Sequence, residues 1–254
     1  MMRTRWLQRF SLILACIAVA LAAALLVLPA RWLMLVLPTH WPLAIVDAAG
    51  TIWRGSALVA LGPPGARTTL PQPFHWRAGW EQGLRLQLEH PWLGCVWALR
   101  PGLSGLGLAP CTLRLPAGVL AAVGMPLNTI KPSGRLDLRW PGMRLPYRGG
   151  VPDGPLLTLD WTEAGSALSL IQPLGDYRLT LHGRDNTAQI GLATTRGVLE
   201  LEGSGALHPR QGLSFSGTAQ PAARATPQQI AGLQAMLSAI GRRSGNATLL
   251  QIGR

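Results

Sequence analysis

The chain has 254 residues, enough to bury the core of one large domain or of two small ones. Its 23 basic residues outnumber its 11 acidic residues, for a net charge of +12. Nucleic-acid-binding proteins gather such charge on one face, but the arginines here are scattered, with no basic run beyond Arg242-Arg243 and no nucleic-acid-binding motif. This spread argues against a nucleic-acid partner and favours an arginine-rich surface near anionic lipid head groups.

An apolar segment near the amino terminus predicts a single transmembrane helix. It begins at Ser11 and Leu12, ends at Leu28 and carries no charge over 18 positions, which span roughly 27 Å as a helix, close to the thickness of a bilayer core. Three arginines precede the segment, whereas only Arg31 follows it closely. By the positive-inside rule, residues 1–10 form a cytoplasmic tail and the chain after the helix is exported.

A cleaved signal peptide is the alternative to this anchor. Ala20-Leu21-Ala22 has the spacing of small residues that signal peptidase requires. That site, however, lies inside the apolar segment, and Pro29 and Trp32 mark the exit only later, with Trp41 also suited to the membrane–water interface. An uncleaved anchor is therefore favoured, with residues 29–47 as the segment that leaves the membrane.

Two of the three cysteines lie in the exported region. Cys95 and Cys111 are sixteen positions apart, in a compartment where disulfides persist, and the Gly- and Pro-rich stretch between them resembles a hairpin connection that brings its ends together. A disulfide is preferred over the alternative of two unpaired buried thiols. Cys16 falls inside the predicted anchor.

The exported region is predicted to be mainly β, with one or two helices. Apolar residues recur at every second position, and Gly and Pro punctuate the pattern at short intervals. The predicted strands are 84–90, 112–115, 135–140, 177–182, 198–202 and 213–216. A short helix is predicted over 115–124 and a longer one over 226–243. The longer helix has a capping box at Thr226 and an apolar stripe of Ile230, Leu233, Leu237 and Ile240.

An internal similarity suggests two related antiparallel β modules. Gly50 recurs as Gly134 and Trp76 as Trp161, at shifts of 84 and 85 positions. The first module is placed at 48–124 and the second at 125–254, the second including the carboxyl-terminal helix and a final strand. The pattern does not decide whether the modules form separate sheets or one continuous sheet.

No local motif for catalysis or metal binding is present. The chain lacks G-x-S-x-G, its five histidines stand at least fifteen positions apart, and Glu200 and Glu202 face solvent on one strand. Lys131, the only lysine, precedes Pro132 in a turn and is expected to point to solvent. We therefore predict a chain that is not an enzyme, without catalytic residues, metal ligands or a cofactor. A membrane-anchored hydrolase built from distant residues is a minor alternative.

The order of these segments resembles the type II secretion system protein N family. The resemblance covers essentially the whole chain and is strongest at "PLNTIKPSG". It rests on the anchor followed by "GTIWRGSA" (50–57), "HPWL" (90–93), 115–140, "PLGDYRLTLHG" (173–183), "TTRGVLELEGSGAL" (194–207), "LSFSGTA" (213–219) and 240–254. The resemblance implies a non-enzymatic, single-pass component of the cell inner membrane with most of its chain in the periplasm. The implied partners are inner-membrane platform proteins, the outer-membrane secretin and membrane lipid, with no small-molecule substrate.

Two tryptophans beside turns, Trp80 and Trp92, are the candidate contacts for these partners, because tryptophan is enriched in binding hot spots. Trp76, Trp140 and Trp161 lie within strand patterns and are expected to fill the core instead. Sheet edges or an apolar groove would offer partner strands a place to add. The alternative function is a membrane-anchored periplasmic protein that binds or bridges lipid along an apolar trough.

Overall fold

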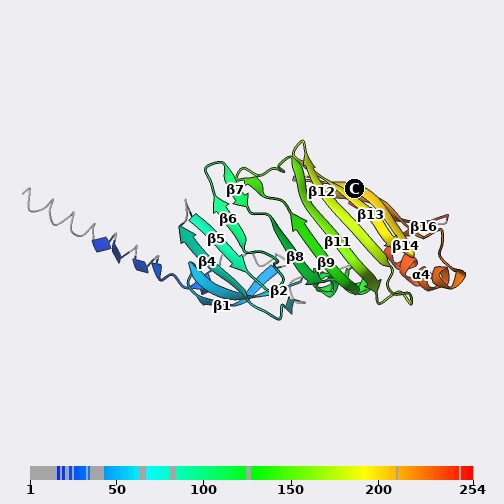
Figure 1. Cartoon of the computed structure of the whole chain (residues 1–254), viewed down its shortest axis with the longest axis horizontal. Coiled ribbons are helices and arrows are strands. Elements are labelled where there is room, and N and C mark those ends of the chain that lie inside the picture. The colour runs from blue at the N-terminus through cyan, green and yellow to red at the C-terminus, as the bar shows by residue number, and fades with distance from the viewer. Residues whose placement is uncertain are drawn as a thin grey trace, which may run out of the picture.

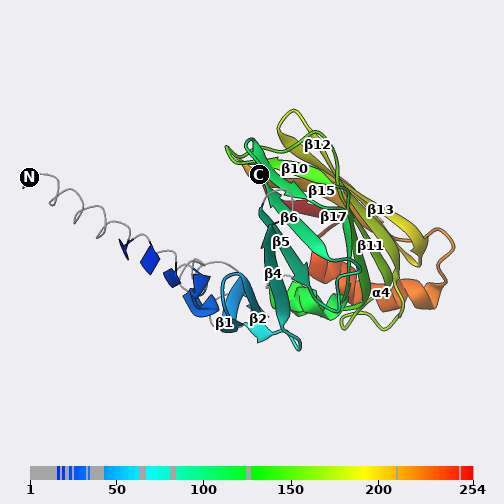
Figure 2. The ribbon, with the colours of Figure 1, turned by 60° about the vertical axis from the view of Figure 1, so that its left-hand side comes forward.

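The computed structural model describes residues 16–17, 19–20, 23–24, 26–32, 34, 43–62, 67–80, 84–123, 127–209, 211–245 and 247–253. These residues form two antiparallel sheets side by side, with the amino-terminal segment leaving the body near β1 (Figure 1). The fold is thus mainly β with few helices, as the alternating pattern predicts. Both sheets are strongly curved (Figure 2).

The first sheet contains eight of the described strands in the order β1-β2-β4-β5-β6-β7-β10, with β3 paired to β2. Its alternating residues place apolar side chains on one face, and the row Ala78, Leu86, Leu99, Leu108 and Met143 runs directly across five strands. The strands are β1 (Leu43–Gly50), β2 (Arg54–Leu61), β3 (Thr68–Thr69), β4 (Phe74–Trp80), β5 (Leu84–Glu89), β6 (Trp97–Pro101), β7 (Gly105–Leu108) and β10 (Met143–Pro146).

The second sheet contains nine of the described strands in the order β16-β17-β15-β14-β13-β12-β11-β9-β8. Here Leu113, Leu138, Leu159, Leu179 and Leu192 pair directly in a row across five strands, and all five are half-buried. The strands are β8 (Cys111–Pro116), β9 (Pro132–Trp140), β11 (Gly154–Ser166), β12 (Gly175–Arg184), β13 (Thr187–Gly197), β14 (Leu199–His208), β15 (Gly212–Pro221), β16 (Arg242–Ser244) and β17 (Ala247–Ile252).

Each of the six predicted strand segments lies largely in a strand, and both predicted helices are present. The first is the 3₁₀ helix η2 (Ala117–Val123), which is followed by α3 (Leu127–Ile130); η1 (Ala30–Trp32) precedes the sheets. The second is α4 (Pro227–Ile240), which begins at the capping box formed by Thr226 and Gln229. The buried side of α4 differs from the predicted apolar stripe. Leu233 is buried as predicted, but Met236, which the stripe did not include, is also buried, and Ile230 is 38% exposed.

Helix α4 covers the apolar face at one end of the second sheet. Leu233 and Met236 pack with Leu174, Leu199 and Ala219 to form the larger buried cluster. Gly232 lets the 168–173 loop approach the helix, because a Cβ there would lie 2.8 Å from the Ile171 side chain. The first sheet has its own small cluster around Ala57 and Trp76.

The two sheets share one long two-stranded ribbon. Leu108 of β7 pairs with Met143 of β10, and Cys111 of β8 pairs with Trp140 of β9, in the same register. Pro110 therefore falls opposite Pro141, and because proline has no N–H, the ladder is interrupted there. The ribbon joins the sheets at this interruption. The strands therefore form two separate hydrogen-bonded sheets and not one continuous sheet.

The predicted module boundary at 124/125 does not coincide with the division between the sheets. Strand β8, at 111–116, belongs to the second sheet, and β10, at 143–146, belongs to the first. The exchange follows from the shared ribbon, because each of its two chain segments runs from one sheet into the other. The first strand begins at Leu43, within the expected exit segment and before residue 48, where the first module was placed.

The residues of the internal similarity have matching local roles. Gly50 and Gly134 both have positive φ, at 86° and 100°. The Trp76 indole N–H donates to the Ile52 carbonyl at 3.1 Å, and the Trp161 N–H donates to the Ser133 carbonyl at 2.9 Å. The stretches that follow the two tryptophans differ in structure. Residues 84–89, after Trp76, form strand β5, whereas residues 168–173, after Trp161, form a loop. The relationship between two modules therefore stays a hypothesis.

Candidate interaction surfaces

The described residues contain no group of three His, Cys, Asp or Glu side chains that could hold a metal ion. Lys131 is exposed and directly follows α3; its N–H donates to the Leu127 carbonyl at 3.0 Å and its φ is 46°. Its side chain lies on a turn, as the sequence predicts. Four features of the fold define surfaces that a partner could contact.

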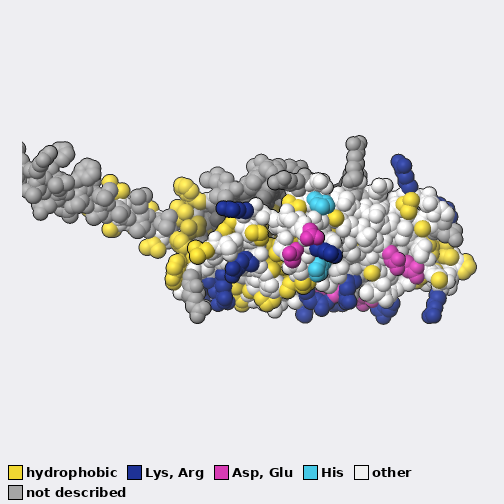
Figure 3. Space-filling model, turned by 90° about the horizontal axis from the view of Figure 1, so that it is seen from above, with side chains coloured by type: hydrophobic (Ala, Val, Ile, Leu, Met, Phe, Trp, Pro, Cys, Tyr) yellow, Lys and Arg dark blue, Asp and Glu magenta, His cyan; other side chains and the backbone are white. Residues whose placement is uncertain are grey.

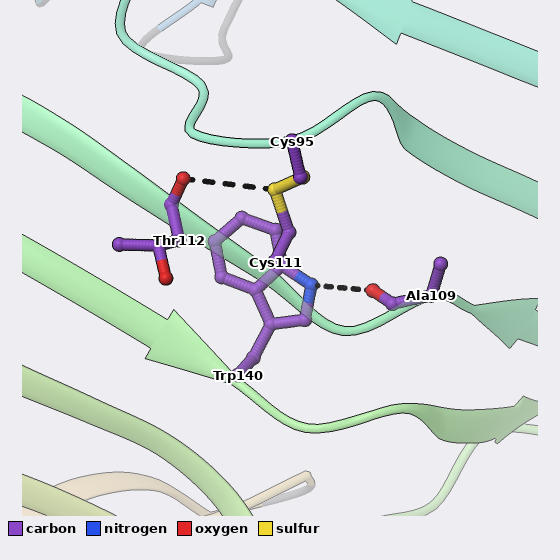
Figure 4. The surroundings of a disulfide bond; sticks show 5 residues. All are labelled: Cys95, Ala109, Cys111, Thr112 and Trp140. Carbon is purple, nitrogen blue, oxygen red and sulfur yellow. Dashed lines mark hydrogen bonds between the residues drawn. A yellow bond between two sulfur atoms is a disulfide. The ribbon is translucent and has the colours of Figure 1, made fainter.

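The first feature is a disulfide at the junction of the sheets (Figure 4). It joins Cys95, before β6, to Cys111 at the start of β8, with a Cα–Cα distance of 5.6 Å. The Trp140 indole donates to the Ala109 carbonyl at 3.1 Å beside it. Sγ of Cys111 also lies 3.6 Å from the Thr112 carbonyl oxygen, a van der Waals contact because a bonded sulfur carries no hydrogen.

The disulfide fastens a segment of chain along the outer edge of β8. The Gly94 N–H donates to the Thr112 carbonyl at 2.8 Å, and the Arg114 N–H donates to the Trp92 carbonyl at 2.7 Å. Residues 92–94 therefore occupy backbone groups of β8 that would otherwise be free for a partner strand. The edge of the second sheet at β8 is closed to strand addition along this stretch.

The second feature is a buried histidine that the sequence pattern does not reveal. A strand histidine is expected at the surface, but His90 is only 6% exposed, with its ring stacked on Phe74 at 4.1 Å and edge-on to Trp92 at 4.9 Å. Its Nδ1 accepts the Trp92 N–H at 3.1 Å, and its Nε2 lies 3.4 Å from the Gln72 carbonyl. Burial lowers the pKa of His90, with a smaller lowering from His75 and an opposing contribution from the Gln72 carbonyl.

The two candidate contact tryptophans differ in their surroundings. Trp92 is half-buried against His90, so most of its ring serves the fold. Trp80, at the end of β4, is 79% exposed, and Leu84, directly opposite on β5, is 37% exposed. Of the expected core tryptophans, Trp76 is buried, whereas Trp140 and Trp161 are half-buried.

The third feature is a row of charges on the polar face of the second sheet. Asp160 is 8% exposed and accepts hydrogen bonds from Arg139 of β9 and Arg178 of β12. Arg114 lies 3.5 Å from Asp137, which pairs with Asp160 across the ladder. Because the acidic and basic groups largely compensate one another, this face is a stabilised sheet surface rather than a site for a charged ligand.

The hydrogen bond to Asp160 raises the pKa of Arg178, whose guanidinium remains protonated at any physiological pH. A shallow groove of about 620 Å³ runs along this row, between Arg114, Arg196 and Glu163. A second cavity, of about 800 Å³, lies beside α4 and is lined by Ile230, Leu237, Glu200 and Arg243, among others.

The fourth feature is the free edges of the sheets. Among the described residues, β1 pairs only with β2 and offers an edge of eight residues, with Val46 49% exposed. A register shift between Ile45 and Asp47 interrupts this edge. The opposite edge, β10, has four residues and ends at Pro146, and β16 has three. Strand β1 is therefore the longest edge in the described part of the chain.

Half of the predicted anchor lies outside the described residues, Ser11 and Leu12 included. None of the helices in the described part is both long and apolar enough to cross a bilayer. The end of the segment is described: the Ile52 N–H donates to the Leu28 carbonyl at 3.0 Å, and Pro29 bridges to Thr51. These bonds attach the exit of the segment to the turn between β1 and β2, and the anchor itself stays a prediction.

Comparison with known proteins finds one family. Residues 42–249 match the family model described as type II secretion system (T2SS), protein N. The match begins one residue before β1 and extends into β17, so it includes both sheets. No curated protein and no solved structure matches the chain.

Proposed function

Because the chain belongs to the type II secretion system protein N family, we propose that it is a non-enzymatic inner-membrane component of the type II secretion machinery. In this proposal residues 1–10 lie in the cytoplasm, residues 11–28 cross the inner membrane, and the two sheets stand in the periplasm. The sheets act as a scaffold that contacts other secretion subunits. The observation that carries the proposal is the family match, and the uncharged 11–28 segment supports the tether.

The partners in this proposal are the inner-membrane platform proteins and the outer-membrane secretin. Strand addition at β1 is the favoured mode of contact, because main-chain hydrogen bonds along a free edge recruit a strand from another protein. The competing edges are shorter or occupied: β10 ends at Pro146, and residues 92–94 cover part of β8. Trp92 adds little to such a contact, since its ring packs on His90.

Photo-crosslinking from the β1 edge tests the contact. A photoreactive amino acid replaces Val46 in the full chain, and Leu249 of β17 provides the control because the two side chains are 49% and 47% exposed. We expect irradiation of cells to attach a second secretion subunit at position 46 and not at position 249. Absence of an adduct at position 46, combined with normal protein secretion after deletion of the chain, would refute the proposal.

Membrane fractionation tests the tether separately. An uncleaved anchor predicts that the chain stays in the membrane pellet after extraction at alkaline pH and that the mature protein retains its first residues. A reporter that is active only outside the cytoplasm should be active when fused after Arg254. A mature amino terminus following Ala22, or a carboxyl terminus accessible only from the cytosol, contradicts this part of the proposal.

A second candidate function, lipid binding, is supported by the apolar rows of the two sheets. The leucines from Leu113 to Leu192 are half-buried, and Trp97 of the first sheet contacts Trp140 of the second with ring centroids 6.1 Å apart. The apolar faces of the two sheets therefore meet at the junction, and an apolar surface that spans both sheets is the kind of surface that acyl chains bind. Mass spectrometry of lipids that co-purify with the chain tests this function, and a lipid-free protein after mild purification contradicts it.

A further inference from the structure

A row of leucines on the apolar face of the second sheet belongs to neither buried cluster. Helix α4 packs mainly against β15, β16 and β17, beyond the strand where the row ends. All the side chains of the row remain partly exposed, although a sheet normally buries its apolar face against another element. The row runs from β8 to β13 and consists of Leu113, Leu138, Leu159, Leu179 and Leu192.

The row has the length of a lipid acyl chain. It crosses the strands at right angles, and with neighbouring strands about 4.8 Å apart its five positions extend over about 19 Å. The acyl chains of one leaflet span roughly 15 Å, half of a bilayer core. Beyond Leu192 the row meets Gly203 and Gly217, over which the Phe215 ring lies, because a Cβ at either glycine would meet that ring. The Phe215 ring therefore ends the row of leucines with another apolar side chain.

The charges of these strands lie on the opposite face. Residues of a strand alternate between the two faces, so Arg139, Asp160 and Arg178 point away from the neighbouring leucines. These three side chains form ion pairs with one another on that polar face. A ligand on the leucine row therefore meets hydrocarbon without an accompanying charge.

The polar atoms that border the row are already bonded or buried. The Trp140 indole N–H donates to the Ala109 carbonyl, and the Thr194 hydroxyl donates to the Leu201 carbonyl. The Trp97 N–H has no partner among the described residues, but it is buried. A polypeptide laid on the row would thus leave its own N–H and C=O groups unpaired at a substantial cost, whereas an acyl chain has no such groups.

The apolar face continues from the row toward the end of the predicted anchor. At the junction, Trp97 of the first sheet contacts Trp140 with ring centroids 6.1 Å apart. The first-sheet row then leads from Met143 to Ala78 of β4, which pairs with β2, and the turn before β2 is bridged to Pro29. On the face shown in Figure 3, hydrophobic side chains gather at the end of the body next to the amino-terminal segment.

We propose that the leucine row binds one acyl chain of a membrane phospholipid, laid across strands β8 to β13. The inference rests on the proposed lipid-binding function, and it also uses the 11–28 segment to bring the apolar face to the bilayer. Because the row offers only hydrocarbon, binding depends on the acyl chain and not on the charge of the head group.

A phospholipid with a photoreactive diazirine in one acyl chain tests the site. The full chain is reconstituted into vesicles of phosphatidylcholine or of phosphatidylglycerol that contain this probe, and adducts are located by mass spectrometry after irradiation. We expect adducts at Leu159 and Leu179 in both kinds of vesicle. A probe with the diazirine in its head group should not label these positions. Labelling that requires the anionic lipid contradicts the inference.

Two neighbouring residues of β12 provide matched variants. Leu179 lies in the row, and Thr180 lies on the opposite face of the same strand. Leu179→Gln places an amide against the acyl chain and should lower labelling at Leu159 at least about fivefold, whereas Thr180→Gln should leave it unchanged. Urea titration first establishes that each variant folds, and the adduct map of the unsubstituted chain tests the site even where Leu179→Gln does not fold.

The outcomes separate this inference from the functions on which it rests. Adducts confined to the 11–28 segment overturn the acyl site and leave the tether standing. Lipid that co-purifies with the chain but does not label the row overturns the acyl site and leaves lipid binding standing. A photoreactive amino acid in place of Leu159 that attaches to another protein in cells, and not to lipid, also overturns the inference.

Discussion

At the scale of single residues, burial holds two titratable side chains in their neutral forms. His90 is 6% exposed, and neutral imidazole suits its contacts, because Nδ1 accepts the Trp92 N–H. Tyr177 is 3% exposed, and its hydroxyl donates to the Leu199 carbonyl at 3.1 Å. Burial raises the pKa of Tyr177, with a smaller rise from the neighbouring Asp176 carboxylate. Both side chains therefore form their hydrogen bonds within the fold in the neutral form.

His90 predicts a loss of stability in mild acid. Because its pKa is lowered in the fold, the unfolded chain takes up the proton first as the pH falls below about 6.5, and the free energy of unfolding falls with it. Protonation also places a hydrogen on Nδ1, where the Trp92 N–H already donates. Urea titrations at about pH 7.5 and pH 5 measure the effect. His90→Phe should reduce the difference in the free energy of unfolding between the two pH values, and a variant with the same difference as the original chain would contradict the assignment.

The two tyrosines form a matched pair for a second test. Tyr177→Phe leaves the Leu199 carbonyl without its hydroxyl donor inside the core, and we expect a cost of about 1–2 kcal/mol in the free energy of unfolding. Tyr147 is 60% exposed, so Tyr147→Phe should change stability by less than about 0.5 kcal/mol. The comparison uses denaturant titration of the two variants under identical conditions, and similar losses would show that the Tyr177 hydroxyl is not needed.

At the scale of elements, helix α4 stabilises the second sheet by covering the apolar ends of β14 and β15. Leu233 is fully buried against Leu199 and Ala219, whereas Ile230, one turn earlier, is 38% exposed. Away from the helix, the apolar face of the second sheet is half-buried, because leucines on neighbouring strands pair directly and shield one another from water. The helix is therefore the main cover that the described chain provides for this end of the sheet.

Two apolar side chains of α4, Leu233 and Ile230, should contribute differently to the free energy of unfolding. Leu233→Ala removes a fully buried side chain and should lower the free energy of unfolding by about 2–5 kcal/mol. Ile230→Ala, in the same helix, should cost no more than about 1 kcal/mol because much of that side chain is in water. Thermal or denaturant unfolding of both variants gives the comparison. A larger loss at Ile230 would mean that α4 is rotated relative to the sheet.

At the scale of the whole molecule, the junction between the sheets decides how the molecule is organised. The ribbon of β7–β8 and β9–β10 is interrupted at Pro110 and Pro141, and the apolar positions change from even to odd numbers across the interruption. Trp97 nevertheless contacts Trp140. The strands therefore turn at the prolines, so that the apolar faces of both sheets lie on one side.

The disulfide beside this junction predicts a change in stability on reduction. Cys95→Ser with Cys111→Ser opens a loop closed over 16 positions and should lower the free energy of unfolding by about 3 kcal/mol in the chain-entropy model. Thiol counting checks the bond first: the unfolded chain should have one reactive thiol before reduction and three afterwards, because Cys16 is free. Three reactive thiols without reductant would show that the bond does not form in the cell.

The local predictions succeed where neighbouring residues decide the structure. Alternating apolar positions locate the strands around Leu136, Leu179 and Leu201, and the Thr226 capping box locates the start of α4, because both signals act over a few residues. The exposed positions of Trp80 and Lys131 follow from their places beside turns. The burial of His90 could not be predicted, because Phe74 and the Gln72 carbonyl reach it from another part of the chain.

The sequence by itself therefore determined the β character of the chain after the predicted anchor, its helices, the family and the segment expected to anchor the chain. The tertiary structure decided which strands share a sheet, that β8 and β10 exchange sides, and that Trp80 at the end of β4 lies at the same end of the sheet as Pro29. The physical reason is the distance along the chain over which each kind of interaction acts. Residue periodicity, capping and hydropathy are set by close neighbours in the chain, whereas strand order and the meeting of distant side chains depend on how the whole chain minimises its exposed apolar surface.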